Sequence, residues 1–153
     1  MSALSEKALY IAKGYIGQKE MPKSSNWGKF VQDCLATVNI FSPAYWCMSF
    51  VYRCYKEAGI SLKLFNPLFK TGGCLLQLQK TPKQNIFTKP QVNDIFILDL
   101  GGGHGHTGIV CEVKGNQFRA VEGNSNMDGS ANGEMVCIPR WRNNSAKYKF
   151  IRF

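Results

Sequence analysis

Hydrophobic residues in the first third of the chain recur at intervals of three and four positions, which is the spacing of one buried helix face. Stripes of this kind predict three helices, over residues 4–15, 27–38 and 47–58. Gly14 and Gly17 indicate where the first helix weakens and ends. Gly59 is well placed to end the third helix, because glycine readily adopts the left-handed conformation of a C-terminal cap.

From Asp94 onward the pattern changes to a period of two with many β-branched residues, which is typical of strands. It predicts five strands, over residues 94–100, 106–113, 117–122, 134–139 and 147–153. The triplet Lys114-Gly115-Asn116 predicts a tight hairpin between the second and third of them. Residues 60–90 hold three prolines and no sustained period, so they are predicted as loop with one short helix near residues 75–78. Helices followed by closely connected strands predict an α+β domain with an antiparallel sheet.

Composition and charge narrow the possible partners. The 153 residues suit a single domain, 1–153, and no apolar run is long enough for stable membrane insertion. The net charge of +9 favours a polyanionic partner, such as an anionic cell wall, a membrane surface or nucleic acid. The basic residues are scattered, so nucleic acid is not expected as a partner. Residues 1–6 lack a secretory leader pattern, so we expect synthesis in the cytoplasm and some other route to any site outside it.

Six cysteines are present, without a C-x-x-C pair, so neither a zinc ribbon nor a thioredoxin-like site is expected. Without a leader, reduced thiols are the default expectation. Five of them need only be small buried packing residues, namely Cys34, Cys54, Cys74, Cys111 and Cys137. Cys47 differs because it falls at the start of the third predicted helix. There the helix dipole and unpaired N–H groups favour a thiolate and would stabilise an oxyanion, although a buried structural thiol fits the same position.

Both histidines lie in one glycine-rich segment, residues 101–110. The turn delivers His106 to the first residue of a predicted strand, where its ring would face a helix and serve as a base for a thiol. His104 lies two residues earlier, in the turn. With no third histidine and no cysteine pair nearby, His-x-His makes a poor metal site, so neither a metal nor another cofactor is expected.

The predicted hairpin brings a third group to the same place. If residues 106–113 pair with residues 117–122, the start of one strand lies beside the end of the other. Glu122 or Asn124 would then neighbour His106 and could orient its imidazole. A solvated carboxylate at a strand end is the plainer interpretation of Glu122.

A Trp-Cys pair at a helix start, then His-Thr-Gly-Ile-Val opening a strand, then Glu-Gly-Asn closing the next, resembles the CHAP domain family over residues 8–140. The resemblance implies a papain-like, NlpC-related fold, with N-terminal helices packed on a roughly five-stranded antiparallel sheet. It implies that Cys47 is the nucleophile, His106 the base and Glu122 the orienting residue, with Asn124 as a further polar member. Two positions depart from the family pattern: Asn93 replaces the usual glycine, and Met48 replaces the alanine that usually follows the nucleophile.

The resemblance also implies a hydrolase of peptidoglycan amide bonds that acts as a monomeric lysin or interbacterial toxin. The bond would be the sugar–L-alanine amide, a stem-peptide bond or the cross-bridge, with Trp46, Met48 and His104 on the substrate side. Besides peptidoglycan, an immunity protein or a holin-type or secretion export partner is expected. Two alternatives stay open: a thiol acyltransferase or deamidase with a non-wall substrate, and a non-catalytic wall-binding module.

Overall fold

The computed structural model describes residues 2–153 and combines helices with an antiparallel sheet. The helices precede the sheet in the chain: α1 (Ala3–Gly14), α2 (Lys29–Ala36), α3 (Cys47–Leu62) and α4 (Cys74–Lys80), then the short 3-10 helix η1 (Lys83–Asn85). The strands are β1 (Ile86–Phe87), β2 (Ile95–Gly101), β3 (His104–Lys114), β4 (Gln117–Ser125), β5 (Met135–Cys137), β6 (Arg142–Asn143) and β7 (Tyr148–Ile151). The predicted α+β class is therefore confirmed.

The sheet has seven strands in the order β1-β7-β2-β3-β4-β5, with β6 paired to β4. The five predicted strands correspond to β2, β3, β4, β5 and β7, and the predicted hairpin joins β3 to β4 through the pair Lys114–Gln117. The sequence pattern did not predict β1 and β6. Each has only two residues, which is too short for a period of two to be seen.

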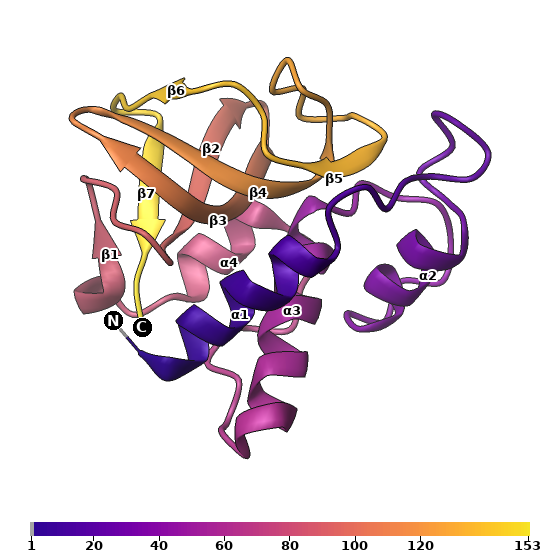
Figure 1. The fold of residues 1–153 in the computed structure, drawn as a ribbon, viewed down its shortest axis with the longest axis horizontal. Helices are drawn as coiled ribbons and strands as arrows, with labels where there is room; N and C mark the ends of the chain where they lie inside the picture. The colour runs from indigo at the N-terminus through magenta and orange to yellow at the C-terminus, as the bar shows by residue number, and fades with distance from the viewer. Residues whose placement is uncertain (1) are drawn as a thin grey trace.

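Helices α1, α3 and α4 lie against one face of the sheet (Figure 1). Their apolar stripes bury residues such as Ala8, Val51 and Cys54 together with Ile97 and Val121 from the strands. The strands curl around a second cluster of four rings, in which Phe118 meets Tyr148 and Phe150 edge to face and those two rings are stacked. Phe96 packs on Phe118 at a tilt. Both faces of the central strands are thus covered, which holds the ends of β3 and β4 in fixed positions. No helix within residues 2–153 is long and apolar enough to cross a membrane.

The end of α3 differs from the prediction. The helix continues past Gly59 to Leu62, and Lys63 adopts the left-handed cap conformation, with φ of 56°. A β-carbon at Gly59 would lie 2.8 Å from the carbonyl oxygen of Leu64. Glycine is therefore needed there because the returning chain passes close to the helix, and not as a cap.

Candidate active site

Cys47 is the first residue of α3, and its side chain is only 3% exposed. The preceding residue, Trp46, has a non-helical backbone, and its carbonyl accepts the first helical hydrogen bond from the N–H of Phe50 at 2.9 Å. The N–H groups of the first turn therefore have no partner within the helix. They point toward the region of the thiol and give it a positive electrostatic surrounding.

His106 lies in β3 opposite Leu98 of β2 and is fully buried. Its Nε2 atom lies 3.0 Å from Oε1 of Glu122 in β4, so the hairpin brings the two residues together as predicted. Nδ1, the other ring nitrogen, has no hydrogen-bond partner within residues 2–153. The carboxylate therefore fixes the ring through one nitrogen and leaves the other one available.

Gly108 explains how Glu122 reaches the histidine. It precedes Ile109, which pairs with Val121, so Gly108 lies beside Glu122 on the neighbouring strand. A β-carbon at position 108 would lie 2.7 Å from Cγ of Glu122. The side chain of Glu122 thus lies across a position where only glycine leaves room, and it ends at His106.

Sequence analysis missed Arg142, which comes from the short strand β6. Its guanidinium group donates to both oxygens of Glu122, at 2.5 Å from Nη2 to Oε1 and 3.0 Å from Nη2 to Oε2. Nη2 also donates to the carbonyl of Gly129 at 3.1 Å, and the group lies over the ring of Phe96. Glu122 is fully buried, so the paired guanidinium group compensates for its lost contact with water and holds it in one orientation. Arg142 is one of several arginines in a basic stretch, and no periodic pattern singles it out.

The thiol and the imidazole shift each other's pKa. The pKa of Cys47 is well below its usual value of 9, first because the thiol of Cys74 hydrogen-bonds to it, and then because His106 and the N–H of Met48 favour the thiolate; burial opposes them. Burial lowers the pKa of His106, but Cys47 and Glu122 outweigh it and raise that pKa to about 9. Both shifts favour a thiolate beside an imidazolium over a neutral thiol beside a neutral imidazole.

Cys74 is the second group that the sequence did not reveal, since it was expected to be a packing residue. It begins α4, and its Sγ lies 3.6 Å from Sγ of Cys47. The pKa of Cys74 is raised well above its usual value, first by the hydrogen bond to Cys47 and then by burial. No motif marked this position, because residues 60–90 lack a period and the contact depends on tertiary structure.

The other predicted residues are placed differently. The indole N–H of Trp46 donates to Glu20 at 3.0 Å, and Met48 is fully buried in the cluster beneath the helices. Both side chains are buried in the core and have no exposed surface, so their expected contact with substrate stays a prediction that this geometry does not support. Asn124 is buried with φ of 54°, and its amide has no hydrogen-bond partner within residues 2–153. It does not hydrogen-bond to His106; Glu122 does.

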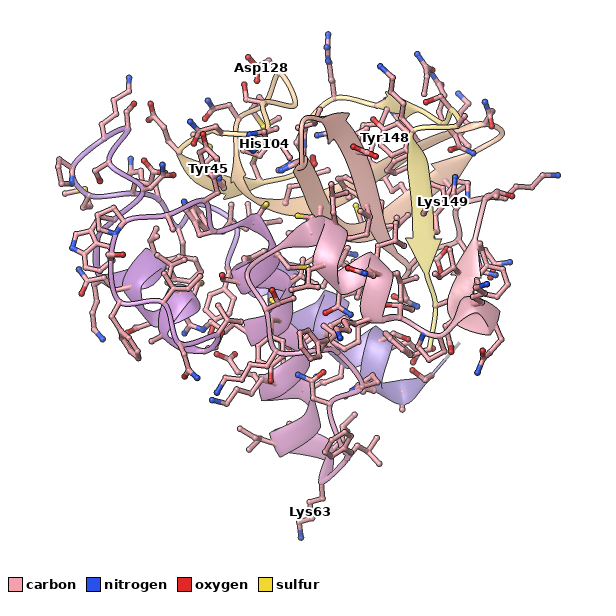
Figure 2. All side chains as sticks on the ribbon, turned by 180° about the vertical axis from the view of Figure 1, so that it is seen from behind. Tyr45, Lys63, His104, Asp128, Tyr148 and Lys149 are labelled. Carbon is pink, nitrogen blue, oxygen red and sulfur yellow. The ribbon has the colours of Figure 1, made fainter. Side chains whose placement is uncertain are left out.

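His104 lies on the surface beside this site. A pocket of about 220 Å³ is lined by Tyr45, Leu100, His104, Gly105, Ala131 and Asn132. Tyr45 precedes Cys47 by two residues and Gly105 directly precedes His106, so the pocket adjoins the buried pair. Figure 2 shows Tyr45 and His104 close together at one end of the molecule, with Lys63 at the opposite end. Their rings meet edge to face at 6.5 Å.

Within residues 2–153, no group of three or more histidine, cysteine or acidic side chains is arranged to hold a metal ion. What the residues do bring together is a thiol at a helix start, an imidazole and a buried carboxyl group, which are the three kinds of group that cysteine-nucleophile enzymes combine. The family model described as the CHAP domain matches residues 39–124, more than half of the chain, and this span includes Cys47, His106 and Glu122. The chain therefore belongs to the CHAP domain family, whose members are typically cysteine- and histidine-dependent amidohydrolases or peptidases. No curated protein and no solved structure matches the chain.

Proposed function

We propose that this protein hydrolyses an amide bond of peptidoglycan, with Cys47 as nucleophile and His106 as acid and base. The observation that carries the proposal is the pair itself: a thiol of lowered pKa beside an imidazole that is held through Nε2 and has Nδ1 without a partner. In structures without substrate, a catalytic hydrogen bond is often poorly aligned and becomes short only in the complex.

The reaction follows from these groups. The Cys47 thiolate attacks the amide carbonyl carbon, and the N–H groups at the start of α3 hold the resulting oxyanion. Imidazolium His106 then donates its Nδ1 proton to the leaving amine, the carbon–nitrogen bond breaks, and a thioester remains on Cys47. Neutral His106 next takes a proton from water, whose oxygen attacks the thioester and releases the acid product.

Glu122 and Arg142 would act through the histidine. Glu122 keeps the ring in the orientation in which Nδ1 faces the thiol and stabilises the imidazolium. Arg142 positions both carboxylate oxygens, so that Glu122 keeps its place when His106 changes charge. Asn124 is proposed only as a further polar member of the site.

We assign substrate recognition to the pocket next to the pair. Tyr45 offers an exposed ring and His104 an exposed imidazole, both suited to a polar peptide or sugar chain. The net charge of +9 favours attraction to anionic wall polymers, so binding to sacculi should weaken as salt is added. A lysin or an interbacterial toxin, with an export or immunity partner, is the setting that this chemistry suits.

Muropeptide analysis tests the proposal. Purified sacculi are incubated with the wild type, with Cys47→Ala and with Cys111→Ala, which removes a buried thiol from β3 away from the pair. The wild type and Cys111→Ala should release defined fragments, and the fragment masses identify the sugar–peptide, stem or cross-bridge bond. Cys47→Ala should release none while keeping its circular dichroism spectrum. Full lytic activity in Cys47→Ala would overturn the assignment. Acylation of an added protein or polyamine, with no muropeptides released, would indicate an acyltransferase.

A further inference from the structure

The second sulfur in the site, that of Cys74, has no part in the hydrolysis described above. Cys47 and Cys74 are the first residues of α3 and α4, and their sulfur atoms lie 3.6 Å apart. Both are nearly enclosed, at 3% and 6% exposed. Within residues 2–153, no other two cysteine sulfurs share a hydrogen bond.

Glycines on two sides let Cys74 come this close. A β-carbon at Gly105 would lie 2.9 Å from Cβ of Cys74, and one at Gly72 would lie 2.8 Å from Cδ1 of Ile40. Strand β3 therefore packs directly against the side chain of Cys74, and the segment before α4 packs directly against Ile40. Cys74 is held against the site by the fold on both sides.

The two thiols are chemically unequal, which suits a stepwise oxidation. Cys47 carries the lowered pKa and is the thiolate, so it is the sulfur that attacks an oxidant. Cys74 has the raised pKa and keeps its proton, which it loses only when it attacks an oxidised partner. A disulfide has sulfurs about 2.05 Å apart, so closing the contact requires a movement of about 1.5 Å.

We propose that Cys47 and Cys74 form a reversible disulfide that switches the enzyme off and protects the nucleophile from irreversible oxidation. A peroxide is the oxidant: the Cys47 thiolate takes one oxygen, the O–O bond breaks, and hydroxide or alkoxide leaves. Sulfur of Cys74 then attacks the sulfenic acid, a sulfur–sulfur bond forms and water leaves. A dithiol reductant returns both thiols by exchange. The bond itself follows from the geometry, whereas its meaning as a switch rests on the proposed function.

The test is chemical mapping of the full chain after hydrogen peroxide, with free thiols then blocked and the protein digested without reduction. In the wild type and in Cys111→Ser, we expect a product lighter by two hydrogen atoms that links Cys47 to Cys74. Trypsin separates the two sites, because Arg53 and Lys56 lie between them. Cys34 shares the tryptic peptide 30–53 with Cys47, so fragment spectra must assign the link to Cys47.

Cys74→Ser provides the contrast. Its Cys47 should gain oxygen atoms instead of forming a link, and dithiothreitol should not restore its activity, whereas the wild type should recover in proportion to the linked fraction that is reduced. Oxygen addition at Cys47 in the wild type without a link, a link to another cysteine, or full recovery of Cys74→Ser would overturn the proposal. If Cys74→Ser shows no cooperative thermal unfolding, Cys74→Ala replaces it. The disulfide map of the wild type tests the proposal without either variant. The link is measured on the protein, so it stands or falls separately from cleavage of sacculi.

Discussion

The sheet contains two buried carboxylates that are each held by an arginine, and they have different neighbours. Arg142 binds Glu122 at the site, while Arg152, just after β7, binds Asp94, just before β2, with distances of 2.7 and 2.8 Å. Each guanidinium group also lies over a phenylalanine ring, Arg142 over Phe96 and Arg152 over Phe87. The same device thus occurs twice.

The third partner makes the difference. Asp94 accepts a further hydrogen bond from the backbone N–H of Gln91 at 2.7 Å, which fixes the turn that opens β2. Glu122 instead binds the ring of His106. An arginine–carboxylate pair therefore does not by itself indicate a catalytic role. What the pair does depends on the third group that the carboxylate binds.

The largest contrast is expected between Glu122→Gln and Asp94→Asn. Glu122→Gln removes the charge that stabilises imidazolium His106, so kcat/KM on sacculi or a stem peptide should fall by about 10²- to 10⁴-fold. Asp94→Asn should leave kcat/KM within about twofold while lowering the melting temperature. Equal losses of activity in the two variants, measured well below both melting temperatures, would mean that the carboxylate of Glu122 serves only the fold.

Replacement of the arginines gives the next effect. Arg142→Met and Arg152→Met each leave a buried carboxylate without its cation, so denaturant titration should show a loss of about 3 kcal/mol in the free energy of unfolding. Only Arg142→Met should also lower kcat/KM. We expect a loss of about 10- to 100-fold, the size seen when a group that orients a metal ligand is removed. Unchanged kcat/KM in Arg142→Met would limit this arginine to a structural role.

The fall of activity at alkaline pH should depend on Glu122 and not on Asp94. The pKa of His106 is raised from 6.5 to about 9, and Glu122 contributes to the rise. The imidazolium that protonates the leaving amine is thus lost as pH rises through about 9, and kcat/KM should fall about tenfold per unit above it. Histidine ring NMR should show a lower pKa for His106 in Glu122→Gln and the wild-type pKa in Asp94→Asn. The spectrum of His104→Ala assigns the signals, and an unmoved pKa in Glu122→Gln would contradict the expectation.

The smallest effect concerns the ring beneath the second arginine. In Phe87→Leu the cation–π contact of Arg152, with 4.0 Å to the ring centroid, is lost, and the free energy of unfolding should fall by about 0.5–1 kcal/mol with activity unchanged. Tyr10→Leu is a matched control, because it removes a cation–π contact with Lys7 at an exposed ring on α1, away from both arginine–carboxylate pairs. A change of activity in Phe87→Leu would show that the two ends of the sheet are coupled.

Patterns in the local sequence predicted the site residues that lie in periodic segments, and they did not predict the others. The hairpin of β3 and β4 placed Glu122 beside His106, because register follows from a short turn and alternation. Arg142 and Cys74 come from segments without a period, and they reach the site only through tertiary packing. Gly59 was misassigned for a related reason: a glycine needed for close approach and a glycine needed as a cap look alike until the neighbouring chain is seen.

The position of β7 has a consequence for how the protein is made. This strand is the last in the chain, yet it lies between β1 and β2 and pairs with both. During translation, β2 keeps an open edge and β1 has no strand partner until residues 148–151 leave the ribosome. Arg142, which holds the carboxylate of the site, is also among the later residues to emerge. The nascent chain can therefore complete the sheet and the surroundings of Glu122 only after these last residues have been synthesised.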